Sequence, residues 1–269
     1  MALVTIEDLT NGNEEPEDME FLRSFSQRFH RWLHDRQRRQ PPRAAGIHAS
    51  EISCSRRVVY CLTKTEQRQE HDIDWLLRFE MGHAVHGMLQ NLFKEMATES
   101  ESRMTFEPEF KIDSTLGKYA EMWSIDSSCD GVMTFFDYDG KVTRRMVLEI
   151  KTKSDDSYDK LTAPEPQHIE QAHVYMACLD IPVAWFLYWN KNNQNYTQTS
   201  IEPFVVRFDE KLWHNLMERF DTIHHHALAG TLPDRRVSFE CQLCPYKHTC
   251  NPSMGSRQSV RLPRSWSKP

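Results

Sequence analysis

The chain has 269 residues, of which 39% are hydrophobic and 27% charged, with a formal net charge of −6. This length allows one sizeable core with attachments, or at most two small domains. The longest apolar run, residues 181–189, is too short to cross a bilayer. The acidic N-terminus lacks the basic-then-apolar pattern of a signal peptide, so we expect a cytoplasmic protein.

Basic residues are concentrated in two stretches, although the whole chain is acidic. Seven arginines from Arg23 to Arg43 stand against one acid, Asp35, and residues 253–269 carry four basic residues and no acid. Such local fields can hold a phosphate backbone, while solvated surface is the alternative explanation. We expect residues 1–17 to be disordered and residues 253–269 to form a flexible basic tail.

Hydrophobic periodicity divides the chain into helices and strands. Helices are predicted at 18–39, 56–62 and 74–96, followed by strands at 105–112, 128–138 and 144–151. Asp139-Gly140 is a good hairpin turn between the last two of these strands. A helix that starts near Pro164 and Pro166 should run to Leu179, with strands at 182–189 and 199–208 after it. Asp209 should cap a last helix through His226, which Gly230 ends.

This order predicts an α/β fold with a mixed central sheet flanked by helices. We expect a single domain over residues 18–252, with a helical part at 18–100 and the core at 101–230. A cysteine-containing segment at 231–252 would follow. Seven cysteines are many for a cytosolic chain, where clustered thiols indicate a metal or redox site and disulfides are disfavoured.

Two acidic motifs lie on the predicted strands. Asp130-Gly131 follows the start of one strand, and Glu149 and Lys151 alternate with apolar neighbours on another, so they share a face. A carboxylate and a lysine on so apolar a strand are costly to bury unless they are paired or bound to metal. Gln171 and Tyr175 lie one turn apart on the helix that follows.

Phosphodiester hydrolysis needs this combination of groups. Hard oxygen ligands hold Mg²⁺ or Mn²⁺, which polarises the phosphate and acidifies a water molecule. Asp130, Glu149 and the carbonyl of Ile150 would supply oxygen ligands. Lys151 would be the cation that orients the water and stabilises charge in the transition state. Each motif is weak alone, and their order and spacing together carry the prediction.

The series Gly82-x-x-x-His86, Asp130-Gly131, Glu149-x-Lys151 and Gln171-x-x-x-Tyr175 resembles the RecB-like branch of the PD-(D/E)XK nucleases. The resemblance implies that His86 is a further metal ligand and that Gln171 and Tyr175 position substrate and active-site groups. Cys129 stands before Asp130, at a position that varies within this branch. The resemblance also implies a restriction-endonuclease-like core.

A second motif, Cys241-x2-Cys244-x5-Cys250, needs a fourth ligand. Cys54 is the best candidate, with Cys61 as a substitute, and His248 can instead complete a local zinc site. Spacing alone leaves zinc and iron–sulfur nearly even. The order of one early cysteine followed by C-x2-C-x5-C resembles that of RecB-like nucleases of the Cas-four type. The AddB nuclease domain is the next most similar. The resemblance implies a [4Fe–4S] cluster that ties Cys54 to the C-terminal segment.

The function expected from these motifs is a Mg²⁺- or Mn²⁺-dependent deoxyribonuclease acting on single strands or frayed ends. The resemblance implies an exonuclease of 5′→3′ polarity in CRISPR adaptation or recombination and repair, with a CRISPR integrase or recombination proteins as partners. Three alternatives stay open: a non-catalytic DNA-binding partner with a nuclease fold, an endonuclease that trims ends with a partner, and an RNA nuclease.

Overall fold

The computed structural model describes residues 17–39, 46–67, 73–99, 101–191 and 200–250. The predicted disordered N-terminus and the basic tail at 253–269 lie outside these residues, except for Glu17, which begins a helix. The chain divides into two compact units. The first comprises Met1–Arg43 and His71–Arg78, and the second comprises Ala44–Glu70 and Phe79–Pro269.

The first unit contains helix α1 (Glu17–Arg38), as predicted, and the first residues of α3 (Ile73–Thr98). An open groove on α1 is lined by Arg28, Arg31, Trp32, Asp35, Arg38 and Arg39. Phe25, Phe29 and Trp32 are exposed, and the rings of Phe29 and Trp32 stack 6.2 Å apart. This helix therefore presents arginines and aromatic rings to solvent together.

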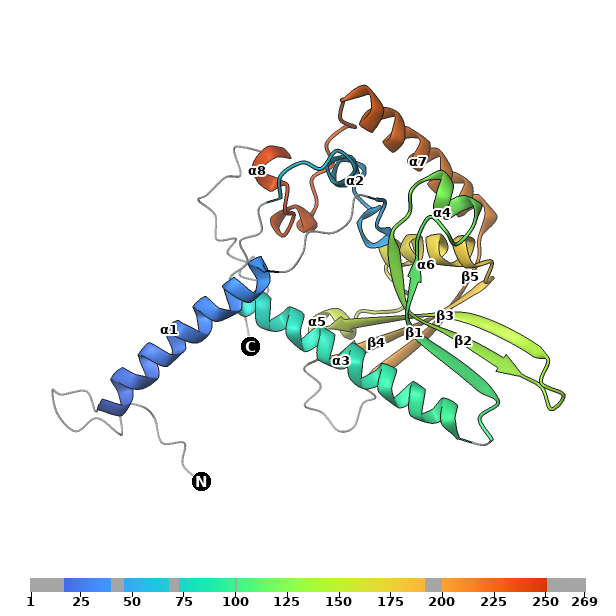
Figure 1. The fold of residues 1–269 in the computed structure, drawn as a ribbon, viewed down its shortest axis with the longest axis horizontal. Helices are drawn as coiled ribbons and strands as arrows, with labels where there is room; N and C mark the ends of the chain where they lie inside the picture. Colours follow the sequence, from blue (N-terminus) through green and yellow to red (C-terminus); the bar gives the residue numbers. More distant parts are fainter. Residues whose placement is uncertain (1–16, 40–45, 68–72, 100, 192–199, 251–269) are drawn as a thin grey trace. The chain divides into compact units, whose positions relative to one another are not determined.

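The second unit is built on one five-stranded sheet in the order β1-β2-β3-β4-β5 (Figure 1). The strands are β1 (Met104–Ile112), β2 (Ser127–Phe136), β3 (Val142–Lys153), β4 (Val183–Asn190) and β5 (Ile201–Arg207). All neighbours are antiparallel except β3 and β4, which are parallel. A parallel pair needs a crossover, and α6 (Pro166–Leu179) supplies it. The predicted α/β class with a mixed central sheet is confirmed.

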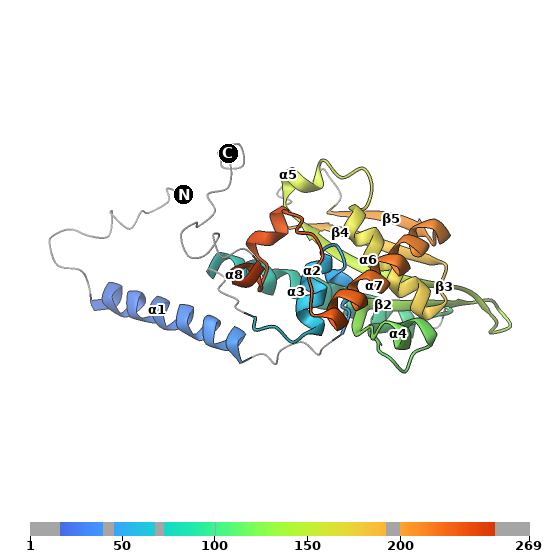
Figure 2. The ribbon, with the colours of Figure 1, turned by 90° about the horizontal axis from the view of Figure 1, so that it is seen from above.

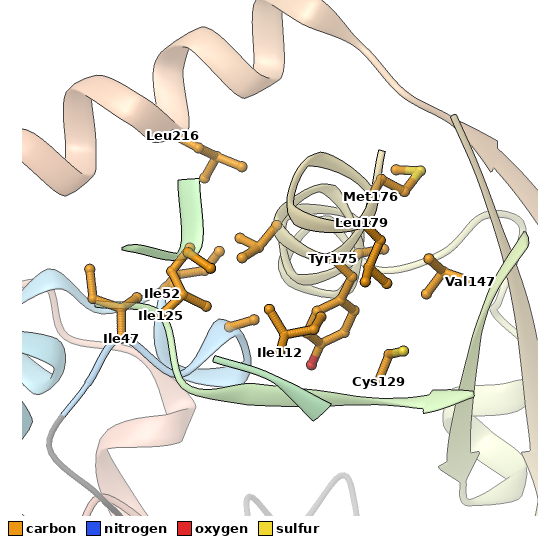
Figure 3. Close-up of a cluster of buried hydrophobic side chains, with 14 of the residues drawn as sticks. Ile47, Ile52, Ile112, Ile125, Cys129, Val147, Tyr175, Met176, Leu179 and Leu216 are labelled. Carbon is orange, nitrogen blue, oxygen red and sulfur yellow. The ribbon is translucent and has the colours of Figure 1, made fainter. Parts of the chain in front are cut away.

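Helices cover both faces of this sheet (Figures 1 and 2). On one face, α6 and α7 (Glu210–Ala229) share a large apolar cluster with residues of α2 (Ser55–Leu62). Figure 3 shows Tyr175 reaching from α6 toward the strands, near Ile112 and Cys129. On the other face, Val85, Leu89 and Phe93 of α3 pack on a second cluster that includes Leu148 and Ile150.

The predicted helix signals at the end of the core are confirmed. Asp209 caps α7, its carboxylate accepting from the backbone N–H groups of Lys211 and Leu212, and Gly230 ends the helix with φ +64°. The short elements were not predicted, because a single turn shows no hydrophobic period. They are η2 (Ala49–Glu51), α4 (Lys118–Met122), α5 (Asp155–Tyr158), η3 (Phe239–Gln242) and α8 (Lys247–Cys250). Within the described ranges, no helix is both long and apolar enough to span a membrane.

Candidate active site

Glu149 and Lys151 lie on the face of β3 that α6 covers, as the alternation along the strand predicts. The ammonium of Lys151 donates to Oε1 of Glu149 at 2.5 Å and to Oε1 of Gln171 at 3.0 Å. Gln171 in turn donates from Nε2 to the hydroxyl of Tyr175 at 2.8 Å. The structure therefore brings four of the predicted site residues into one hydrogen-bonded chain from β3 to α6.

Asp130 connects β2 to α3 and to β3. Its Oδ1 lies 2.9 Å from Nδ1 of His86, and its Oδ2 accepts the backbone N–H of Ile150 at 2.5 Å. Burial lowers the pKa of His86, but the hydrogen bond to Asp130 and the charges of Asp130 and Glu149 outweigh it, so the pKa is raised. The predicted set of His86, Asp130, Glu149, Ile150 and Lys151 is thus assembled at one place.

Glu149 is the most unusual group in this set. It is 2% exposed, and its Oε2 is buried without a hydrogen-bond partner. Burial raises its pKa to about 7; the charge of Lys151 opposes this shift and the charge of Asp130 adds to it. A buried carboxylate with an unpaired oxygen beside a second carboxylate is costly, unless a cation balances the charge.

The donor chemistry suits a hard divalent cation. Glu149 Oε2 and the Asp130 carboxylate are oxygen donors of the kind that Mg²⁺ and Mn²⁺ bind. The N–H of Ile150 points toward Asp130, and the N–H and C=O of a strand residue point to the same side, so its carbonyl faces the site as well. Even so, no three His, Cys, Asp or Glu side chains in the described part of the chain form a group that could hold a metal ion. Both Asp130 oxygens are already engaged by His86 and Ile150.

Two residues that the sequence analysis missed adjoin this set. Gln90, which is 7% exposed, donates from Nε2 to the backbone carbonyl of Asp130 at 2.9 Å and to Oε1 of Glu109 at 2.6 Å. Glu109 stands opposite Asp130 in the β1–β2 register, between the pairs Pro108–Gly131 and Phe110–Cys129, and has φ +48°. Positive φ is costly for a side-chain-bearing residue and often accompanies functional sites. Gln90 lies one turn after His86, which is the only signal that pointed to it.

The two motif glycines differ in their surroundings. A Cβ on Gly131 would overlap the ring of Phe106 and lie 3.1 Å from the carbonyl oxygen of Glu107. A Cβ on Gly82 would meet only Thr152 Oγ1, at 3.7 Å, which is ordinary contact. Gly131 is therefore required sterically next to Asp130, whereas the surroundings of Gly82 leave room for a Cβ.

The four cysteines predicted to act together line one cavity. Cys54 precedes α2, Cys241 lies in η3, Cys250 ends α8, and Cys244 lies between the last two. Burial raises the pKa of Cys54, and the nearby Cys241 and Cys250 raise it further. The other lining residues are mostly cationic: Arg56, Arg57, Tyr60, Arg235, Arg236, Val237 and Lys247.

The remaining thiols and the alternative zinc ligand lie outside this lining. Cys61 and Cys129 are buried, Cys178 is half-buried, and His248 has a buried Nδ1 without a partner. The lining thus matches the set with Cys54 rather than the local set with His248. Both sides of the cavity are also joined directly, because Ser53 donates to Glu240 at 3.0 Å and Tyr60 stacks on Tyr246.

No family model and no curated protein matches the chain. Among solved structures, that of SSO0001 is 14% identical and covers 84% of this chain and 96% of its own, with a TM-score of 0.49. An alkaline exonuclease from Laribacter hongkongensis is 14% identical over 70% of this chain and 90% of its own, with a TM-score of 0.49. A phage-related exonuclease from Haemophilus somnus 129PT is 10% identical and covers 69% of this chain and 94% of its own, with a TM-score of 0.42.

Proposed function

We propose that the chain is a divalent-metal-dependent nuclease that hydrolyses phosphodiester bonds in DNA. One observation carries this proposal: Glu149 is buried with one oxygen unpaired, beside Asp130, while its other oxygen accepts from Lys151. A structural ion pair would satisfy both oxygens, whereas a cation-binding carboxylate needs one of them for the cation.

The residues divide the work in the following way. Asp130, Glu149, the Ile150 carbonyl and His86 would hold Mg²⁺ or Mn²⁺. The bound metal would polarise the scissile phosphate and lower the pKa of a water molecule. Lys151 orients the attacking water and stabilises negative charge on the phosphate oxygens. Gln171 fixes the lysine, and Tyr175 fixes Gln171, so these two act by positioning.

The substrate proposed is single-stranded DNA or a frayed end, degraded from the 5′ end. The polarity follows from the resemblance of the motifs to RecB-like nucleases of the Cas-four type, as do CRISPR integrase or recombination proteins as partners. The setting proposed is cytoplasmic, because the acidic N-terminus lacks a signal-peptide pattern. The side chains of α1 favour a single-stranded substrate, because exposed rings can stack on bases and the arginines beside them can neutralise phosphates.

For the cysteine cavity we propose a [4Fe–4S] cluster held by Cys54, Cys241, Cys244 and Cys250. Four thiolates carry more negative charge than the cluster's iron and sulfide core offsets, and the cationic lining suits that excess. A four-thiolate zinc site has the same need, so the choice of iron rests on the resemblance. The cluster would join the segment before α2 to the C-terminal segment and take no part in cleavage.

The test is cleavage of end-labelled single-stranded DNA by anaerobically purified protein with Mn²⁺, compared with Lys151→Ala and Lys141→Ala. Lys141 is exposed at the β2–β3 turn, and its variant should cleave like the parent protein. Lys151→Ala should lose activity by two orders of magnitude or more, about the scale of lost electrostatic stabilisation. Equal cleavage by both variants would contradict the catalytic assignment.

The alternatives give different outcomes in the same assay. A DNA-binding partner without turnover would bind the strand and leave it intact with either metal. An endonuclease would release internal fragments before mononucleotides, and it would cut a circular single strand. An RNA nuclease would cleave the ribo-oligonucleotide of the same sequence faster than the DNA.

A further inference from the structure

The charged row on β3 continues beyond the proposed catalytic lysine. Glu149, Lys151 and Lys153 alternate along the strand, so all three face α6, and neighbours in the row lie about 6.6 Å apart along the strand. That spacing is comparable with the separation of successive phosphates in an extended nucleic-acid strand. Lys153 therefore stands one phosphate step beyond Lys151.

The ammonium of Lys153 has an ion-pair partner and keeps further hydrogen-bond donors. Its ammonium donates to Oε1 of Glu165 at 2.5 Å, and its side chain is 17% exposed. An ammonium has three N–H donors, so this ion pair leaves others for a second acceptor. Gln167 donates to the other oxygen of Glu165 at 2.8 Å and keeps the carboxylate in place.

His168 adds a neutral donor beside the lysines. The hydroxyl of Tyr188 accepts the backbone N–H of Glu165 at 3.1 Å and lies 2.8 Å from Nδ1 of His168. We assign this hydroxyl as the donor to Nδ1, which leaves the proton of the neutral imidazole on Nε2. Burial, with the charges of Lys151 and Lys153, lowers the pKa of His168 to about 2, so the ring stays neutral.

We propose that Lys153 and His168 form a second phosphate subsite, which binds the phosphodiester next to the one that is cleaved. This inference rests on the proposed function and deepens it, because it makes at least two linked phosphates the substrate. Lys153 supplies charge, and Nε2–H of His168 supplies a directed hydrogen bond. Tyr188 and Glu165 position these two groups.

The first experiment measures binding of a short single-stranded oligonucleotide in EDTA at several salt concentrations. Lys153→Met should weaken binding about tenfold, as for a lost hydrogen bond between charged groups. It should also reduce the slope of log K against log[salt] by about 0.7, the value for one contacted phosphate of a single strand. Lys153→Arg should retain the slope. Lys141→Met, at the exposed residue just before β3, should change neither quantity. An unchanged slope for Lys153→Met with intact folding would overturn the subsite.

The second experiment measures cleavage and separates this proposal from the proposed function. One methylphosphonate replaces the linkage adjacent to the scissile one, and kcat/KM is compared between variants. The uncharged linkage should lower kcat/KM of the parent protein about tenfold. It should lower kcat/KM of Lys153→Met much less, because the mutation has already removed the contact. His168→Gln, whose amide nitrogen can replace Nε2, should keep more activity than His168→Asn. If the methylphosphonate lowers kcat/KM of Lys153→Met as much as that of the parent protein, the subsite is refuted, and the proposed nuclease activity is not. No cleavage by any form would refute the nuclease, and the binding experiment would still decide the subsite.

Discussion

Lys151 on β3 and Gln171 on α6 are joined by a 3.0 Å hydrogen bond from Nζ to Oε1. The sheet provides one partner and the crossover helix provides the other, so the bond forms only when α6 packs on the parallel β3–β4 pair. The orientation of the proposed catalytic lysine is therefore a property of the crossover as much as of the strand.

Gln171→Leu should lower kcat by about 10–100-fold, the usual cost of removing a group that orients a catalytic residue. KM for a short single strand should change much less, because Lys153 and α1 keep their side chains. Steady-state kinetics over a range of substrate concentrations checks this. A rise in KM at constant kcat would show that Gln171 binds substrate instead.

Tyr175→Phe should destabilise the protein by about 1–3 kcal/mol, because the mutation leaves the buried Nε2 of Gln171 without its acceptor. Activity should fall less than in Gln171→Leu, since Oε1 of Gln171 still faces Lys151. Urea unfolding gives the first quantity and single-turnover cleavage the second. A larger loss of activity than in Gln171→Leu would indicate a direct role for the hydroxyl.

Gly131→Ala and Gly82→Ala should behave in opposite ways. The new methyl group at Gly131 overlaps the ring of Phe106, so we expect a loss of about 1–3 kcal/mol in the free energy of unfolding. At Gly82, within α3, the methyl group has room, and alanine should raise stability by up to about 1 kcal/mol. Thermal unfolding of the two variants measures both effects. Similar losses would mean that α3 lies closer to β3 than described.

Affinity for Mn²⁺ should rise with pH through the neutral range. The pKa of Glu149 is raised to about 7 and that of His86 is raised too, and both groups must lose protons to bind metal. One released proton gives up to about a tenfold gain per pH unit below the pKa.

The same shift changes the stability of the metal-free protein. A carboxyl with a raised pKa in the folded state contributes stability below its unfolded pKa, and that stability is lost as the pH rises through about 7. Added Mn²⁺ should therefore raise the unfolding temperature more at pH 8 than at pH 6, and Glu149→Gln should flatten this difference. A metal effect independent of pH in the parent protein would argue against Glu149 as a ligand.

Cys54→Ser should lose the bound metal, whereas Cys178→Ser should keep it. Cys54 lines the four-cysteine cavity, and the half-buried Cys178 lies elsewhere, on α6. Elemental analysis and visible absorption of the anaerobic proteins distinguish iron from zinc. Stoichiometric zinc in a colourless parent protein would replace the iron–sulfur proposal, and retained metal in Cys54→Ser would remove Cys54 from the ligand set.

Much of the site was predictable because it lies along single elements. The alternation of Glu149 and Lys151 is a property of any strand, and the turn between Gln171 and Tyr175 is a property of any helix. The longer elements followed from periodicity for the same reason.

Residues whose roles depend on register were not predictable. Glu109 approaches Gln90 because it stands opposite Asp130 and adopts a positive φ, and no local pattern encodes either fact. Nδ1 of His168 lies 2.8 Å from the hydroxyl of Tyr188, a residue of the next strand, and no local pattern in α6 encodes this contact. The orphaned oxygen of Glu149 likewise depends on how three layers pack together.

The four cysteines of the cavity are synthesised at widely separated times. Its first thiol, Cys54, leaves the ribosome long before Cys250, by about 10–40 s at ordinary elongation rates. Through that interval the sheet and its crossover can form while Cys54 has no partners. Insertion of the proposed cluster would therefore be a late event, and only chains synthesised as far as Cys250 would hold it.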